Sequence, residues 1–125
     1  MIRILGFLLV MILFSSCQDY HDRTSVGEST AKQIVQDALN NKNYKPFYDT
    51  LIKDKETAIA MAEPILFKLY SKKNIIAERP YECYLIDGYW FISGTLPKNK
   101  NVSGGVFEII INSKNGEVVK LIHEK

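Results

Sequence analysis

The sequence predicts an α+β domain in which N-terminal helices pack on a four-stranded antiparallel meander sheet. Three observations support this prediction. Apolar residues recur at helical spacing between residues 30 and 72, the segments after residue 80 alternate apolar and polar residues as strands do, and two glycine-containing turns divide those segments into hairpins. The length of 125 residues suits one such domain.

The first sixteen residues predict an export signal. Residues 1–16 contain one basic residue, Arg3, then an apolar run from Ile4 to Phe14 and two serines. This run is shorter than the about 20 residues that cross a bilayer. Cys17 follows directly, and the segment resembles a bacterial lipoprotein signal, although Phe14 stands where leucine is usual. We expect lipid attachment at Cys17 and a lipid-anchored protein of the bacterial cell envelope, in its periplasmic or surface leaflet; a plain secretory signal is the alternative.

Residues 17–28 are polar and lack an apolar period, which predicts a flexible tether ahead of a domain at 29–125. Removal of the leader takes away Arg3 and leaves 15 of the 16 basic residues against 14 acidic ones. This balance offers no basic stripe, so we expect no nucleic-acid partner. Cys83 is then the only thiol besides an acylated Cys17, and the fold must depend on its core instead of a disulfide.

The first helix is expected from about Thr30 to Leu39, with Ser29 or Thr30 as its N-cap. Its apolar residues at helical spacing are Ala31, Ile34, Val35, Ala38 and Leu39. The segment that follows mixes aromatic residues with a proline and predicts an ordered loop or a short helix. We expect Phe47 and Leu51 to pin this segment to the domain.

The second, longer helix is expected to follow the N-cap Asp54 and to reach about Lys72. Its apolar stripe is Ile59, Ala62, Leu66, Leu69 and Tyr70. Pro64 cannot donate a backbone hydrogen bond to the carbonyl of Ala60, which predicts a kink inside the helix. A break into two helices is the alternative.

The first hairpin is expected to turn at Asp87-Gly88, because both positions of a two-residue hairpin turn need positive φ. This turn sets the pairing, which starts with Ile86 opposite Tyr89. One face of the hairpin then carries Tyr81, Cys83, Leu85, Trp90, Ile92 and Gly94. The other face carries Glu82, Tyr84, Ile86, Tyr89, Phe91 and Ser93. We expect the first, apolar face to pack on the long helix.

The second hairpin is expected to turn through a three-residue loop, Lys114-Asn115-Gly116, with Gly116 left-handed and Ser113 opposite Glu117. Phe107, Ile109 and Ile111 then share a face with Val119 and Leu121. The opposite face carries Glu108, Ile110, Val118, Lys120 and Ile122. A two-residue loop would put Lys120 beside Ile109 on the apolar face, so the sorting of charge from core favours the longer loop.

The sequence lacks a recognisable catalytic or metal-binding constellation. Its two histidines are His21, in the tether, and His123, near the C-terminus, while Cys83 is expected on the core face, where thiols are inert. A Cys83–His123 pair would require the last strand to lie beside the first. The sequence contains no CxxC, HExxH or Asp-rich loop. We therefore expect no enzymatic activity, no metal and no cofactor.

The face of the sheet that turns away from the core is the candidate binding surface. Tyr84, Tyr89 and Phe91 lie on it among polar groups, a mixture typical of protein-binding surfaces. We predict that these three residues contact a partner, with Glu82 and Lys120 as flanking charges. The alternative is that the N-terminal helix or the aromatic loop before residue 52 covers this face.

The order of several motifs resembles one known family. The helix AEPILFKLY, the Arg79-Pro80 strand entry, the DGYW turn with GTLP, the strand GGVFEIII and the end NGEVVKLIHEK together resemble nuclear-transport-factor-2-like (NTF2-like) immunity proteins of bacterial polymorphic toxin systems. The resemblance covers about Tyr44 to Lys125. It implies a cystatin-like fold and a non-enzymatic protein that binds and neutralises a cognate toxin. A small-ligand-binding lipoprotein, using the concavity between helix and sheet, and a structural envelope lipoprotein are the alternatives.

Overall fold

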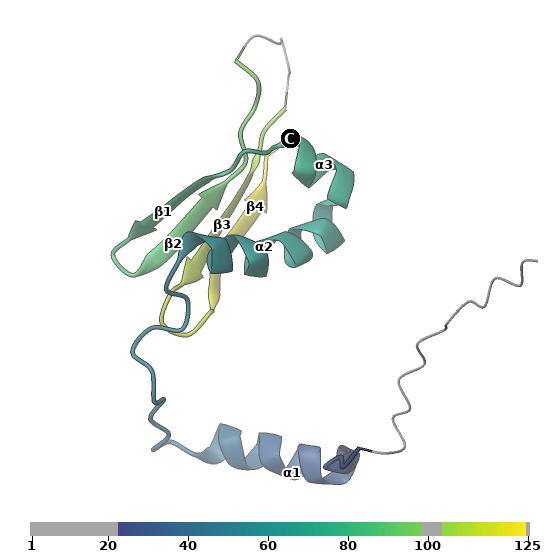
Figure 1. The fold of residues 1–125 in the computed structure, drawn as a ribbon, viewed down its shortest axis with the longest axis vertical. Coiled ribbons are helices and arrows are strands. Elements are labelled where there is room, and N and C mark those ends of the chain that lie inside the picture. Colours follow the sequence, from purple (N-terminus) through teal and green to yellow (C-terminus); the bar gives the residue numbers. More distant parts are fainter. Residues whose placement is uncertain (1–22, 99–103, 125) are drawn as a thin grey trace, which may run out of the picture. The chain divides into compact units, whose positions relative to one another are not determined.

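The computed structural model describes residues 23–98 and 104–124 of the chain (Figure 1). The chain divides between Tyr44 and Lys45 into two compact units. The described helices are α1 (Gly27–Asn40) in the first unit, and α2 (Lys55–Tyr70) and α3 (Lys72–Ala77) in the second. The predicted leader, Cys17 and His21 lie outside the described residues.

Helix α1 begins at Gly27, earlier than the sequence predicts. Val26 occupies the N-cap position and makes no side-chain capping hydrogen bond. The predicted caps Ser29 and Thr30 lie inside the helix, so the predicted N-cap is wrong although the helix itself is confirmed. An uncapped start leaves the first backbone N–H groups of α1 to the solvent.

The second unit contains a four-stranded antiparallel sheet in the order β1-β2-β3-β4, and α2 lies across one of its faces (Figure 1). The strands are β1 (Glu82–Ile86), β2 (Tyr89–Ser93), β3 (Phe107–Asn112) and β4 (Val118–His123). Each strand pairs with the one before it, which confirms the predicted meander. We call the face that packs on α2 the inner face and the opposite face the outer face.

Helix α2 begins as predicted. Oδ1 of Asp54 accepts hydrogen bonds from the backbone N (2.8 Å) and from Oγ1 (2.9 Å) of Thr57. The helix continues through Pro64, so the alternative of two helices broken at this proline is wrong. It ends at Tyr70, because Ser71 has a positive φ of 73°. The sequence did not predict α3, since its six residues are too few to show a period.

The buried residues of α2 follow a row with a spacing of four. Ala58, Ala62 and Leu66 are buried, and the same row ends at Tyr70, which packs against the core. The predicted stripe also included Leu69, which is 59% exposed. Leu69 belongs to the next row of the helix, together with the exposed Ile65 and Met61, so its predicted burial is wrong.

Ile52 fixes the loop before α2 to the sheet. The backbone N of Ile52 donates to the carbonyl of Ser113 (2.9 Å), and the indole Nε1 of Trp90 donates to the carbonyl of Ile52 (2.9 Å). The Ile52 side chain is fully buried, whereas Phe47 is 98% exposed and Leu51 is half exposed. Phe47 does not pin this loop, so that part of the prediction is wrong. Leu51 does hold the loop through its backbone N, which also donates to the carbonyl of Ser113 (3.0 Å).

The first hairpin has the predicted register. Ile86 lies opposite Tyr89 and Cys83 opposite Ile92, and the turn residues Asp87 and Gly88 have φ values of 49° and 83°. Leu85 lies on the predicted side of β1 but is 54% exposed. Because β1 is an edge strand with a single neighbouring strand, its residues are less covered than those of β2.

The second hairpin has a longer loop than predicted. The backbone N of Asn112 donates to the carbonyl of Glu117 (2.8 Å), so four residues separate the paired positions instead of three. Gly116 has a φ of 77°, in agreement with the predicted left-handed conformation. The extra loop residue shifts the pairing beside the turn by one position.

A β-bulge at Val119 reverses this shift. Ile111 pairs with Val118, whereas Ile110 pairs with Lys120, so β4 skips one residue between them. From Lys120 onward the register is the predicted one. Val119 was predicted on the core face, but the bulge places its side chain in the wall of a groove on the outer face. The prediction for Val119 is therefore wrong.

The hydrophobic core lies between the inner face of the sheet, α2, α3 and the loop at Ile52. Its buried members are Ile52, Ala58, Ala62, Leu66, Ile75, Trp90, Ile92, Phe107, Ile109 and Ile111. The inner face is therefore filled by packed side chains, and the outer face remains for contacts with other molecules.

One carboxylate is buried beside this core. Glu78, directly after α3, is 5% exposed; its Oε2 accepts a hydrogen bond from the backbone N of Phe107 (2.9 Å), and its Oε1 lies 2.6 Å from Nε2 of His123. Gly94 makes room for it, because a Cβ at Gly94 would collide with Oε2 and stand 2.8 Å from the Cβ of Glu78. Glu78 thus ties the end of α3 to β3 and β4.

Candidate functional site

The outer face carries an apolar patch that crosses all four strands. Alternation along β1, β2 and β3 places five of its members and the bulge in β4 places Val119. We call these residues the outer patch: Tyr84, Ile86, Tyr89, Phe91, Ile110 and Val119. Tyr84 pairs with Phe91, and Phe91 pairs with Ile110, so these three side chains form one row across the sheet. A patch built on paired strands is held rigidly before any partner arrives.

Part of the outer patch forms a groove with a volume of about 410 Å³. Its walls are Ile86, Asp87, Tyr89, Phe91, Ile110 and Val119. Asp87 is the only charged member, so the groove suits an apolar side chain with a polar or basic neighbour. Scattered apolar side chains are ordinary on protein surfaces, but a contiguous groove of this kind is typical of an interaction site.

The structure brings all five predicted partner-binding residues to the outer face. Tyr84 is 52% exposed and Tyr89 is 41% exposed, while Phe91 is partly buried in the floor of the groove. Nζ of Lys120 lies 2.7 Å from a carboxylate oxygen of Glu108, an acidic residue of the neighbouring strand. The Lys120 charge is therefore paired with an acidic neighbour on the same sheet.

The remaining predicted residue, Glu82, lies at the far end of β1 from the groove. The hydroxyl of Tyr84 is 3.4 Å from a carboxylate oxygen of Glu82, so this charge faces the edge of the patch. Ile86 and Ile110 were predicted on this face but not as site residues. Val119 could not be placed there, because its position depends on the bulge.

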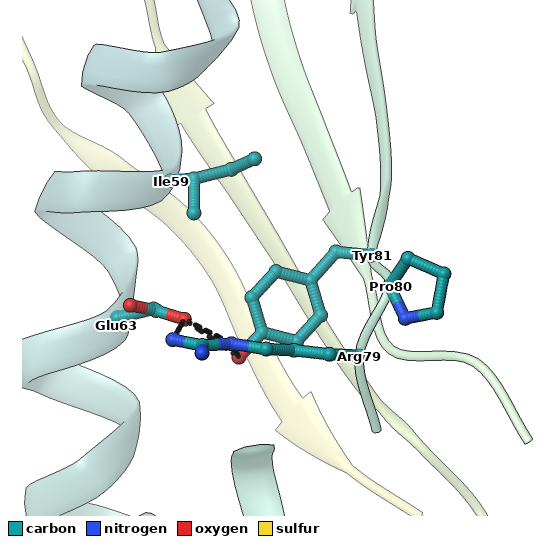
Figure 2. A pocket seen from close by; sticks show the side chains of 5 residues that line it. All are labelled: Ile59, Glu63, Arg79, Pro80 and Tyr81. Carbon is teal, nitrogen blue, oxygen red and sulfur yellow. Dashed lines mark hydrogen bonds and ion pairs between the residues drawn. The ribbon is translucent and has the colours of Figure 1, made fainter. Parts of the chain in front are cut away.

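A second pocket, which we call the rim pocket, lies beside the entry to β1, with a volume of about 490 Å³ (Figure 2). Its walls are Ile59, Glu63, Arg79, Pro80 and Tyr81. Oε1 of Glu63 accepts hydrogen bonds from the Tyr81 hydroxyl (2.8 Å) and from both Nε (3.0 Å) and Nη2 of Arg79. The guanidinium also lies over the Tyr81 ring, 5.9 Å from its centre.

This cluster perturbs two titrating groups. The hydrogen bonds that Arg79 donates to Glu63 raise the pKa of Arg79, so the guanidinium keeps its charge. Burial raises the pKa of the Tyr81 hydroxyl, which stays protonated and donates to Glu63. The arrangement links α2 to the start of β1 and leaves a half-exposed cation at the wall of the pocket. These side chains were not predicted to form a cluster.

The described residues do not form the catalytic pair that the sequence analysis considered. Cys83 lies on β1 and His123 on β4, which are opposite edges of the sheet. Burial raises the pKa of the Cys83 thiol, which lowers its nucleophilic fraction at neutral pH. Within residues 23–98 and 104–124, no group of three or more His, Cys, Asp and Glu side chains could hold a metal ion. None of the helices in these ranges is long and apolar enough to cross a membrane.

A helix laid across a four-stranded meander, with its exposed patch on the far face, defines a small domain of the α+β class. The family model of the NTF2 fold immunity proteins matches residues 57–125, more than half of the chain and entirely within its second unit. The chain belongs to this family of immunity proteins, and its fold is NTF2-like.

Two curated proteins of Escherichia coli (strain K12) are similar to the chain. The uncharacterized protein YhhH is 31% identical over 75 residues, which cover 60% of this chain and 58% of that protein. The uncharacterized protein YbbC is 36% identical over 75 residues, which cover 59% of this chain and 60% of that protein. The chain thus spans about three-fifths of the length of the curated relatives it matches. No solved structure matches the chain.

Proposed function

We propose that this protein binds a cognate protein toxin and neutralises it by occupying a surface that the toxin needs, without a catalytic step of its own. Membership of the immunity protein family is the observation that carries the proposal. The partly buried Cys83 thiol lies on the opposite edge of the sheet from His123, and this supports a protein that acts by contact, because neither group is placed to activate the other.

The outer patch is the surface that we assign to the toxin. Tyr89 and Phe91 lie at its centre, in the groove, and Tyr84 extends the row toward β1. Aromatic residues at the centre of an interface supply most of its binding free energy when a partner excludes water from them. Glu82 and Lys120 flank the patch and give it charges of opposite sign at its borders.

The test is co-expression with a candidate toxin, sought among the products of the genes beside this one. We expect Tyr89→Ala together with Phe91→Ala to weaken toxin binding at least 30-fold, about 2 kcal/mol or more, and to abolish protection of growth. Ile65→Ala with Leu69→Ala is the matched control, because it removes two exposed apolar side chains from α2. Equal affinity and protection in the two double variants would show that the outer patch is not the toxin-binding surface.

We further infer that the protein is held in the cell envelope by lipid on Cys17. The support is the leader at 1–16, with its basic start, apolar run and two serines before the cysteine. Labelled palmitate fed to cells should enter the wild-type chain and a Cys83→Ser variant equally. A Cys17→Ser variant should stay unlabelled; label on that variant would contradict the assignment.

Binding of a small ligand is the second candidate function, and the rim pocket is the observation that favours it. Its volume is in the range of ligand sites, and the Arg79 cation gives it one polar wall. A metabolite or lipid that binds there should raise the melting temperature of the wild-type protein and not that of Arg79→Gln. Thermal stabilisation by the neighbouring toxin alone would exclude this function.

A further inference from the structure

The two edges of the sheet differ in how they are protected against pairing with another strand. The β4 edge carries the bulge at Val119 and the charged Lys120, both of which discourage the addition of a strand. The β1 edge has no register shift against β2, and Glu82 is its only charged residue. Three of its five side chains are large apolar groups that are more than half exposed: Tyr84, Leu85 and Ile86.

The hairpin geometry determines which backbone groups of β1 face the open edge. The residues that flank a two-residue turn form a hydrogen-bonded pair, so Ile86 bonds with Tyr89, and hydrogen-bonded pairs recur at every second position. The backbone groups of Glu82, Tyr84 and Ile86 therefore point to β2. Those of Cys83 and Leu85 point away from the sheet, where only another extended backbone offers both donors and acceptors in register.

We propose that β1 pairs with β1 of a second copy of this chain, antiparallel and centred on Tyr84. In this register Cys83 lies opposite Leu85 of the second copy, and Leu85 opposite its Cys83. Each of these two pairs exchanges two hydrogen bonds, so four backbone bonds cross the two-fold axis. The two four-stranded sheets become one continuous sheet of eight strands.

The β1 sequence is complementary to itself in this register. Cys83 and Leu85 both point to the inner face, so apolar side chains meet apolar side chains and Leu85 gains the cover that it lacks in one copy. On the outer face, Tyr84 meets its own counterpart, and Glu82 lies opposite Ile86. No carboxylate faces another one across the axis, so the pairing avoids like-charge repulsion.

Disulfide trapping tests both the dimer and its register. The central Tyr84 pair is not hydrogen-bonded, which puts its Cα atoms about 4.5 Å apart, within the range that a disulfide spans. We therefore expect the full chain carrying Tyr84→Cys and Cys83→Ser to form a disulfide dimer under mild oxidation. The chain carrying Cys83→Ser alone gives the background that Cys17 contributes.

Two further cysteine variants define the register. Ile86→Cys alone, in the same Cys83→Ser background, should not form dimers above that background, since its counterpart lies four residues away along the strand, about 13 Å. A mixture of Glu82→Cys and Ile86→Cys chains should form mixed dimers, because these positions face each other. Dimers of Tyr84→Cys no more abundant than those of Ile86→Cys would overturn the proposal. A Tyr84→Cys adduct with a protein of another mass would also overturn it and would assign the edge to a foreign strand.

Leu85→Lys gives an independent test without oxidation. A lysine at the open edge should block the pairing and shift the detergent-corrected mass of the purified full chain from dimer to monomer. Val118→Lys, at the exposed start of β4, is the matched control and should leave the dimer intact. If the wild-type chain is monomeric at every concentration that light scattering reaches, and Tyr84→Cys remains untrapped, β1 does not pair with itself. Neither readout depends on a toxin, so failure here leaves the proposed toxin binding standing.

Discussion

Glu78 and His123 are 45 residues apart in the chain, yet Oε1 of Glu78 lies 2.6 Å from Nε2 of His123. The other ring nitrogen, Nδ1, lies 2.8 Å from the carbonyl oxygen of Glu124. A carbonyl oxygen only accepts, so Nδ1 must carry a hydrogen, and a second proton lies between the ring and the carboxyl group. The pair therefore closes the sheet onto the end of α3 with a charge-assisted or acid-type hydrogen bond.

Removal of His123 should destabilise the fold. His123→Ala leaves the buried Glu78 carboxylate with the Phe107 N–H as its remaining partner, and we expect a loss of about 2 kcal/mol in the free energy of unfolding. Urea titration followed by circular dichroism measures this loss. Lys120→Ala, which removes a more exposed ion pair from the same strand, should cost less than about 1 kcal/mol. Equal losses in the two variants would mean that burial of the Glu78–His123 pair adds nothing to the free energy of unfolding.

Gly94→Ala should also destabilise the domain, by about 1–3 kcal/mol, because the new methyl group collides with the Glu78 side chain. A double-mutant cycle with Glu78→Ala tests this reason. In the Glu78→Ala background the methyl group no longer meets Oε2 but still lies 2.8 Å from the Cβ at position 78, so its cost should fall without disappearing. A cost as large as in the wild-type background would assign the glycine requirement to the backbone instead.

The N-cap of α2 should make stability depend on pH in acid. The hydrogen bond from the Thr57 backbone lowers the pKa of Asp54 below its ordinary value of 3.8, so the capping carboxylate stabilises the helix above that value. This contribution is lost as the pH falls through the lowered folded pKa. Asp54→Asn should therefore be less stable than wild type at pH 7 and approach it in urea titrations as the pH falls through the lowered pKa of the folded state. Asp49→Asn, an exposed loop substitution, is the control that should not change the pH profile.

Cys83 should react slowly with alkylating reagents in the folded protein. Burial raises its pKa and covers the thiol on the inner side of β1, so we expect iodoacetamide at pH 7.5 to modify it at least about tenfold more slowly than in 6 M urea. Mass spectrometry of the peptide that contains Cys83 gives both rates. A cysteine introduced at the exposed Leu69 should show nearly equal rates in the two states.

The strand region could be predicted because its turns leave few choices. Asp87-Gly88 sets every pair of the first hairpin, and separation of Lys120 from the apolar face sets most pairs of the second. The sequence determined less well which helix residues are buried. A stripe drawn through Leu69 fits helical spacing as well as the observed row through Leu66 and Tyr70, and only packing on the sheet decides between them.

The candidate site, too, could be predicted only in part from the sequence. Alternation alone places Tyr84, Tyr89 and Phe91 on one face. It could not place Val119, because a longer loop combined with a bulge gives the same pairing from Lys120 onward as a shorter loop without one. The cluster of Glu63, Arg79 and Tyr81 joins residues from separate elements. No local sequence pattern predicts that these side chains come into contact.

The bulge at Val119 lets this fold tolerate a change in the length of the second hairpin loop. The one residue by which the loop exceeds its predicted length is taken up at the bulge, within a few positions of the turn, and the strand beyond keeps its predicted partners. Relatives could therefore lengthen or shorten that tip while the core stays in place. Such freedom next to an exposed groove would let immunity proteins acquire new toxin preferences without having to refold.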